Sequence, residues 1–231
     1  MKAFLLAAGQ GTRLRPITDS IPKCLVPIQG VPMLAIWLTL CRRIGIKEVL
    51  INLHHHADVV LAFLRQNGNS DVRVHLAEEK QLLGSAGTLR ANRSWVDRED
   101  LFWVFYADVL HRADLKAMLR SHRQSGLAAT LGVYQVPDPS RCGIVTADSQ
   151  GVIQDFVEKP SNPTSNLAFS GLMIGTRAVL DVIPDGVPVD IGFHVLPRLA
   201  GQMLAFPIQD YLIDVGTPEN YHQAQATWPG I

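Results

Sequence analysis

Two cations follow the first apolar run of the chain and a pair of glycines. The stretch reads FLLAAGQGTRLRPITDSIPK, with Gly9, Gly11, Arg13 and Lys23 in that order. Glycines let backbone N–H groups turn toward phosphate oxygens, because no side chain blocks the approach. Arg13 can fork two such oxygens while Lys23 adds a point charge. This combination suits a triphosphate whose charge grows on a departing pyrophosphate.

The same loop departs from two common nucleotide-binding patterns. The dinucleotide fingerprint needs a third glycine, but Leu14 stands at that position. A P-loop needs Gly-Lys followed by Ser or Thr, and this sequence does not close the loop in that way. The second strand also ends in INLHHH rather than in an acidic residue. A nicotinamide-binding oxidoreductase is therefore disfavoured.

The elements that must position this loop alternate between strands and helices. Apolar β-branched runs predict strands, and segments of helical period predict helices. This order indicates right-handed βαβ units in a Rossmann-like, three-layer α/β/α fold with a mostly parallel central sheet. The predicted strands are residues 3–8, 48–53, 72–76 and 101–106, and the predicted helices are residues 33–44, 58–66, 87–93 and 114–124.

The pattern changes after residue 128. Four further strands separated by turn signals predict a small antiparallel or mixed extension, at residues 129–136, 143–146, 152–157 and 167–174. Helical pattern returns at residues 176–183, 191–199 and 219–227. We see no linker that forces a second domain, so we expect one domain over residues 1–231. Ligands of such sheets lie at the carboxyl ends of the strands.

Composition narrows the class of protein. The 231 residues are 47% hydrophobic and 18% charged, with 21 Lys+Arg and 21 Asp+Glu, which indicates a globular protein and no nucleic-acid partner. The three cysteines are too scattered for a disulfide framework. The apolar runs are too short for a signal peptide or a membrane span. We therefore expect a soluble cytoplasmic protein without a membrane partner.

Five segments, in order, resemble the sugar nucleotidyltransferases, also called nucleoside-diphosphate-sugar pyrophosphorylases. LAAGQGTRLRPITDSIPKCLVPI is similar to the family signature L-A-G/A-G-x-G-T/S-R-L followed by P-K. EEKQLLGSAG resembles the nucleotide loop, FYADVL the metal strand, FVEKP the sugar-phosphate segment, and LIDVGTPENY the closing element. The resemblance covers nearly the whole chain, and it is closest to short guanylyltransferase-like members.

The resemblance assigns roles residue by residue. Arg13 and Lys23 become the catalytic cations, and Asp108 and Asp214 hold Mg²⁺, the implied cofactor. The nucleotide-binding residues are Leu6, Ala8, Gly9, Gly11, Thr12, Glu79, Gly84, Ser85 and Gly87, and the sugar-phosphate-binding residues are Gly143, Glu158, Lys159, Ser170 and Gly171. The nucleotide-binding part then spans about residues 1–127, and the sugar-phosphate-binding part spans about residues 128–231.

The reaction that the family implies joins an NTP and a sugar-1-phosphate into an NDP-sugar, with release of pyrophosphate by in-line attack on the α-phosphorus. The G-S-A-G loop favours GTP, with mannose-1-phosphate or a heptose-1-phosphate as acceptor. Uridylyl, thymidylyl, adenylyl or cytidylyl transfer to another phosphorylated acceptor stays an alternative. A non-catalytic nucleotide-sugar-binding relative is another alternative. Assembly of two copies as a homodimer also stays open.

Departures from the family pattern weaken the sugar assignment most. Ala107 replaces the usual glycine before Asp108, and Leu82 stands where proline is common. The asparagine often found two residues before Gly171 is missing, so Ser170 or Asn166 would have to replace its hydrogen bond. We expect the histidine run at 54–56 to lead into a helix rather than to chelate a metal. Cys24, beside Lys23, could have a depressed pKa, but we interpret it as packing.

Overall fold

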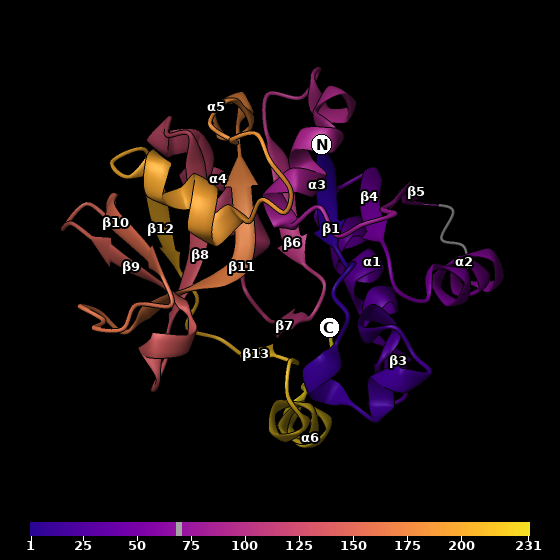
Figure 1. The fold of residues 1–231 in the computed structure, drawn as a ribbon. Coiled ribbons are helices and arrows are strands. Elements are labelled where there is room, and N and C mark those ends of the chain that lie inside the picture. Colours follow the sequence, from indigo (N-terminus) through magenta and orange to yellow (C-terminus); the bar gives the residue numbers. More distant parts are fainter. Residues whose placement is uncertain (68–70) are drawn as a thin grey trace. The chain divides into compact units, whose positions relative to one another are not determined.

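The computed structural model describes residues 1–67 and 71–231, which divide into two compact units. The first unit comprises Met1–Leu82, Phe105–Ala113 and Asp210–Ile231, and the second comprises Leu83–Val104 and Asp114–Gln209 (Figure 1). The units are therefore interleaved along the chain, and the single domain with nucleotide-binding and sugar-phosphate-binding parts that meet near residue 127 stays a prediction.

The first unit is built on three parallel strands. β1 (Lys2–Leu6) pairs with β4 (Glu48–Leu53), which in turn pairs with β5 (Arg73–Glu78). The helices α1 (Met33–Arg43) and α2 (Ala57–Gln66) connect them. The α1 side chains at helical spacing, Leu34, Trp37, Leu38 and Cys41, are all buried. The predicted βαβ arrangement of this part is confirmed.

Several short elements of the first unit escape sequence analysis. β7 (Val109–His111) pairs antiparallel with β13 (Leu212–Asp214), and β2 (Pro27–Ile28) pairs with β3 (Val31–Pro32). The opening loop holds three 3₁₀ turns, η1 (Thr12–Leu14), η2 (Ile17–Asp19) and η3 (Lys23–Leu25). Helix α6 (Pro218–Thr227) packs with these elements through one apolar cluster that includes Leu14, Ile28, Ile213 and Trp228.

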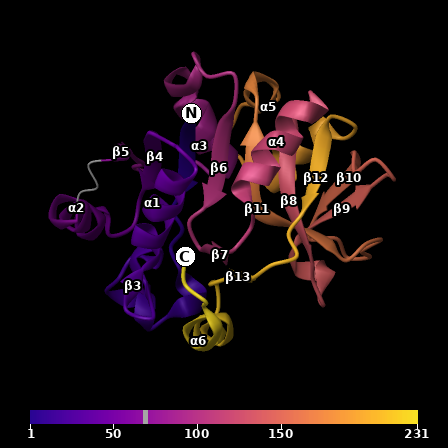
Figure 2. The same ribbon diagram turned by 180° about the vertical axis from the view of Figure 1, so that it is seen from behind.

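The second unit is mainly antiparallel. β9 (Gly143–Ala147) and β10 (Ile153–Glu158) form a hairpin, and β11 (Leu167–Gly175) runs antiparallel to β8 (Ala129–Gln135), which confirms the predicted extension (Figure 2). The unpredicted β12 (Met203–Pro207) adds a parallel strand to β8. The helical elements are α3 (Ser85–Ala91), η4 (Arg93–Val96), α4 (Leu115–Ser125), η5 (Pro139–Arg141) and α5 (Arg177–Asp181). Strand β6 (Phe102–Tyr106) begins in this unit and ends in the first.

The helical segment expected at residues 191–199 is present, but it is not a single α-helix. The segment forms a π turn, η6 (Ile191–Val195), followed by a 3₁₀ turn, η7 (Leu196–Leu199). Pro197 has no N–H to donate, and its ring would clash with a carbonyl one turn earlier in an α-helix. The Asp190 carboxylate accepts hydrogen bonds from the N–H groups of Gly192 and Phe193 and so caps the start of the π turn. Every other predicted element matches the structure to within two residues at each end.

Helix length and polarity bear on membrane insertion. Over residues 1–67 and 71–231, no helix combines the length and the apolar character that a bilayer crossing demands.

Candidate active site

The opening loop leaves β1 at Leu6 and exposes its backbone at Gly9. A Cβ added at Gly9 would meet nothing within 4 Å, whereas one at Gly11 would lie 2.9 Å from Thr18 Cγ2. Gly11 also has a φ of +64°, which favours glycine. The Thr18 hydroxyl donates to the Gly11 carbonyl at 2.7 Å and fixes the turn. Gly11 therefore shapes the loop, while Gly9 leaves the backbone open to solvent. Ala8 is buried, and Thr12 is exposed.

A two-stranded ladder brings the two predicted metal aspartates together. Asp214 pairs with Val109 across β13 and β7, and the Val215 N–H donates to the Asp108 carbonyl at 2.8 Å. Lys23, from η3, is buried and forms a close ion pair with Asp108 Oδ2. Its Nζ also lies 4.0 Å from Asp214 Oδ1. The structure thus gathers three of the predicted site residues into one charged cluster in the first unit.

Asp214 carries the strongest sign of a cation site. Burial, followed by the negative charge of Asp108, raises the pKa of Asp214 from 3.8 to about 6, and Lys23 and Arg13 oppose the shift. Its Oδ1 is buried and has no hydrogen-bond partner among the described residues. A carboxylate oxygen in that state suits a hard cation, and Mg²⁺ commonly binds one or two carboxylates while waters and substrate phosphates complete its shell. The described residues contain no group of three His, Cys, Asp or Glu placed to hold a metal ion. Two carboxylates are nevertheless enough for the implied Mg²⁺, because waters and substrate phosphates can supply its other ligands.

Arg13 lies against the turn between β13 and α6. A Cβ at Gly216 would lie 2.9 Å from Arg13 Nη2 and 2.9 Å from Asp214 Oδ1. The absence of a side chain at 216 therefore leaves room for the guanidinium beside the carboxylate. The Asn220 Nδ2 also donates to the Asp214 carbonyl at 2.7 Å. Sequence analysis missed Gly216, although its place in the DVGTP segment was a usable signal.

Glu79 is buried and held in place by Asn52, a residue that sequence analysis did not single out. Asn52 Nδ2 donates to Glu79 Oε1 at 2.9 Å, and Asn52 Oδ1 accepts from the Ala7 N–H at 2.7 Å. His54 Nδ1 lies 2.8 Å from the Glu79 carbonyl oxygen. His56 adopts a φ of +53° and precedes α2, as the expected helix entry requires. Asn52 therefore ties the Glu79 carboxylate to the start of the opening loop.

The part of the predicted nucleotide loop that lies in the second unit packs on residues 189–191 of the same unit. Gly84 has a φ of +81°, and a Cβ there would lie 2.3 Å from the Val189 carbonyl oxygen. The Gly87 N–H donates to the same oxygen at 3.0 Å. The Ser85 hydroxyl donates to Asp190 Oδ2 at 2.8 Å and accepts from the Ile191 N–H at 2.7 Å. Close packing on residues 189–191 is thus the contact that the structure shows for Gly84, Ser85 and Gly87.

Glu158 fits over two glycines. A Cβ at Gly143 would lie 2.6 Å from Glu158 Oε2, and one at Gly192 would lie 2.3 Å from the same atom. Burial, followed by the charge of Asp190, raises the pKa of Glu158 above its usual value, while Lys159 opposes the shift. The neighbouring Lys159 is exposed and has a φ of +50°. The structure therefore brings Gly143 and Glu158 together, and sequence analysis missed Asp190 and Gly192.

Ser170 and Gly171 lie at an irregularity of β11. The register of β11 against β8 shifts between Phe169 and Met173, and Gly171 has a φ of +80°. Ser170 is buried, and its hydroxyl accepts from the Leu172 N–H at 3.3 Å. A Cβ at Gly132 of β8 would lie 2.6 Å from that hydroxyl. In this structure the Ser170 side chain therefore packs toward β8.

The two buried cysteines, Cys24 and Cys41, are not activated. Burial raises the pKa of both Cys24 and Cys41 to about 12, because a thiolate is poorly solvated in an apolar interior. The depressed pKa considered for Cys24 is therefore wrong, and its interpretation as a packing residue stands.

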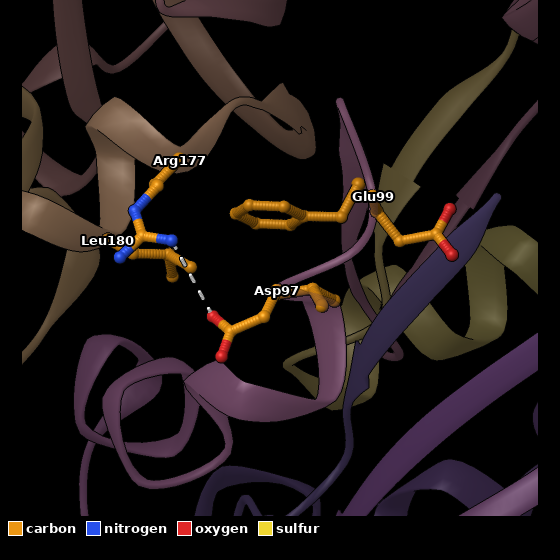
Figure 3. Close-up of a pocket in the computed structure, with 6 residues that line it drawn as sticks. Asp97, Glu99, Arg177 and Leu180 are labelled. Carbon is orange, nitrogen blue, oxygen red and sulfur yellow. Dashed lines mark ion pairs between the residues drawn. The ribbon is translucent and has the colours of Figure 1, made fainter.

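Two cavities of the second unit lie apart from the predicted residues. One of about 50 Å³ is lined by six residues, including Asp97, Glu99 and Leu180, and Arg177 Nη1 lies 4.0 Å from Asp97 Oδ1 (Figure 3). Another of about 230 Å³ is lined by residues of β9 and β10 and by residues of the loop that follows β10. Neither is lined by a residue that the sequence assigns to the site.

Comparison with known proteins settles the family. The family model described as Nucleotidyl transferase matches residues 2–229. The chain belongs to this family. A relative from Xenopus tropicalis, "Mannose-1-phosphate guanylyltransferase catalytic subunit beta", is 34% identical over 226 residues, which is 96% of this chain and 62% of the relative.

Other nucleotidyl transferase relatives carry different names. A Synechocystis protein named "UTP--glucose-1-phosphate uridylyltransferase" is 33% identical over 241 residues, covering 97% of this chain and 62% of that protein. The crystal structure of HddC from Yersinia pseudotuberculosis matches 98% of this chain and 99% of its own, with a TM-score of 0.83 and 25% identity. The chain thus spans about three fifths of the length of these curated relatives and shares its mixed α/β fold with solved members.

Proposed function

We propose that this chain is a sugar-1-phosphate nucleotidyltransferase that forms an NDP-sugar and pyrophosphate. The observation that carries the proposal is the cluster of Lys23, Asp108 and Asp214, in which the buried Asp214 Oδ1 has no hydrogen-bond partner among the described residues. Such a cluster combines a hard-cation site with a fixed positive charge, which are the two elements that phosphoryl transfer needs most. Membership in the nucleotidyl transferase family supports the same reaction class.

Each residue has a separate task in the proposed reaction. Asp108 and Asp214 hold Mg²⁺, which when bound neutralises charge on the reacting phosphates. Arg13 and Lys23 bind the triphosphate and offset the charge that grows on the leaving pyrophosphate. The opening loop offers its backbone at Gly9 to the same phosphates. The chain needs no covalent nucleophile, because the acceptor phosphate is already an anion.

The residues of the second unit bind the acceptor in this proposal. Lys159 binds the phosphate of the sugar-1-phosphate, and Glu158 accepts a hydrogen bond from a sugar hydroxyl. Burial and the charge of Asp190 raise the pKa of Glu158 above its usual value, so affinity for the acceptor should begin to weaken at a higher pH than it would with an ordinary carboxylate.

The buried carboxylate of Glu79 favours guanine as the base. A carboxylate only accepts hydrogen bonds, and guanine presents two adjacent donors, N1–H and the N2 amino group. Uracil and thymine instead present one donor between two acceptor oxygens. The curated guanylyltransferase relative supports GTP with mannose-1-phosphate, and a heptose-1-phosphate is the second acceptor that we favour. The uridylyltransferase relative keeps UTP with glucose-1-phosphate as the competing pair.

Pyrophosphate release over a grid of NTPs and sugar-1-phosphates, with and without Mg²⁺, tests this function. We expect the fastest metal-dependent release with GTP. The variant Glu79→Gln should lower kcat/KM for GTP about tenfold and UTP turnover much less, because one guanine donor then meets an amide donor. The exposed neighbour provides the control, Glu78→Gln, which should change neither. Silence over the whole grid, together with tight NDP-sugar binding, would instead identify a non-catalytic binding protein.

A further inference from the structure

Phe193 of η6 is the feature of the second unit that the proposed function does not yet use. Its side chain is 54% exposed, although single exposed apolar residues are common and need no explanation by themselves. What distinguishes this one is its neighbour. The Lys159 Nζ lies 5.8 Å from the centroid of the Phe193 ring, within the range of a cation–π interaction.

The backbone fixes both residues on either side of this contact. Lys159 adopts a left-handed φ of +50°, and its N–H donates to the Cys142 carbonyl at 2.9 Å. The Phe193 N–H donates to Asp190 Oδ1 at 3.2 Å, and the opposite oxygen of Asp190 accepts from the Ser85 hydroxyl at 2.8 Å. The two side chains therefore start from defined positions, and a chance encounter of two mobile side chains does not account for the contact.

The Lys159 ammonium makes its cation–π contact with the Phe193 ring. Among the residues that the structure describes, no carboxylate forms an ion pair with Lys159. A free lysine side chain populates many rotamers, and binding a phosphate would have to restrict them. An aromatic face restricts the ammonium without neutralising its charge, so the full positive charge stays available to a phosphate.

We infer that Phe193 is a positioning residue for Lys159, holding the ammonium ready for the phosphate of the sugar-1-phosphate. The identity of the bound phosphate rests on the proposed function. The contact between Lys159 and Phe193 is observed independently of that function. A cation–π interaction at an exposed site corresponds to about a twofold to fivefold change in affinity. The effect should appear in the KM for the sugar-1-phosphate and leave kcat and the KM for the NTP unchanged.

Four variants of the full chain test the role in steady-state kinetics: Phe193→Leu, Phe193→Trp, Lys159→Met and the double variant Phe193→Leu/Lys159→Met. Phe193→Leu keeps an apolar side chain but removes the π face, and we expect it to raise the KM for the sugar-1-phosphate about twofold to fivefold. Phe193→Trp restores a π face and should restore the KM. In the Lys159→Met background, Phe193→Leu should add nothing, because its effect passes through the ammonium. An unchanged KM in Phe193→Leu, or an equal increase in both backgrounds, would overturn the inference.

A spectroscopic measurement separates this inference from the proposed function. Reductive ¹³C-methylation keeps the lysine charge, and the Lys159 methyl signal is assigned by its loss in Lys159→Arg. We expect ring-current displacement of that signal in the wild type and in Phe193→Trp, and a normal position in Phe193→Leu. Displacement without pyrophosphate release would keep the contact and defeat the proposed function. The same signal position in wild type and Phe193→Leu would defeat the inference whatever the activity.

Discussion

Lys23 and the two aspartates of the first unit act on one another through charge, whereas the candidate residues of the second unit are placed by close packing around glycines. In the first unit the half-buried Asp214 has a raised pKa, and its buried Oδ1 lacks a hydrogen-bond partner among the described residues. In the second unit, Gly84 packs on Val189 and Gly143 packs under Glu158. The close approach of the two aspartates in the first unit costs free energy until a cation binds them. The glycine contacts of the second unit are steric contacts that need no ligand.

The largest effect should follow from removing one charge of the first unit. Asp108→Asn should lower turnover about a thousandfold, because it removes a ligand from the proposed cation site and a partner of Lys23. The fold should persist, since an amide has the same shape. Fixed-time assays of pyrophosphate release measure the turnover, and circular dichroism shows whether the variant is folded. The exposed Asp210→Asn is the matched control in the same unit, and wild-type turnover in Asp108→Asn would remove the metal assignment.

Adding a methyl group at Gly84 of the second unit should destabilise the fold rather than lower turnover alone. Gly84→Ala places a Cβ 2.3 Å from a backbone oxygen at a positive φ, so we expect the free energy of unfolding to fall by about 2–4 kcal/mol. Gly9→Ala of the first unit is the counterpart, because its Cβ would meet nothing within 4 Å. That variant should keep its stability and raise the KM for the NTP. Urea unfolding and initial-rate kinetics compare them, and equal stability of the two variants would contradict the contrast between the units.

The pH dependence of stability should expose the electrostatic cost in the first unit. The pKa of Asp214 is about 6 in the folded state against 3.8 ordinarily, so the folded protein binds the proton more tightly. This group therefore lowers the free energy of unfolding as the pH rises from about 4 to about 6, and the loss persists above that range. Asp214→Asn should be more stable than the wild type at pH 7.5 by about 1 kcal/mol, since water partly screens the repulsion. Thermal melts should show that the advantage disappears near pH 4, and a variant less stable at pH 7.5 would refute the argument.

The smallest effect on stability should come from a glycine beside a flexible side chain. Gly216→Ala places its Cβ 2.9 Å from the end of Arg13, which can move, and 2.9 Å from Asp214 Oδ1. We expect a change of about 0.5 kcal/mol or less in the free energy of unfolding and a severalfold lower kcat/KM, because the guanidinium is displaced. The matched comparison is Gly84→Ala. A large loss of stability in Gly216→Ala would show that Arg13 is as rigidly packed as the backbone near Gly84.

Sequence analysis predicted elements and residues in proportion to how local their signals are. Long periodic helices and apolar strands were placed to within two residues, because their pattern repeats inside the element. The three-residue strands β7 and β13 were missed, since neither is long enough to show a period. The apolar spacing at 191–199 predicts a helical segment, but it does not predict the change from a π turn to a 3₁₀ turn next to Pro197.

The locality of the signal also decides which residues of the candidate site can be predicted from the sequence. Asp108, Asp214 and Lys23 lie in recognisable motifs, so their types and order could be anticipated. Asn52 and Asp190 have no such signal, because the site residues that they contact, Glu79 and Ser85, lie 27 and 105 positions away in the chain. Phe193 likewise gains its role from Lys159, which a single sequence does not place beside it.

The interleaved units set an order of events during synthesis of the chain. The first unit needs three separate segments, and the last of them, Asp210–Ile231, carries Asp214 and α6. A ribosome that has released residues 1–200 has therefore delivered nearly the whole second unit but only an incomplete first one. The nascent chain should hold one folded half and one open half until translation reaches the segment with Asp214. The charged cluster then forms only after the segment with Asp214 has been synthesised, so a chain truncated before Asp214 would lack the proposed cation site altogether.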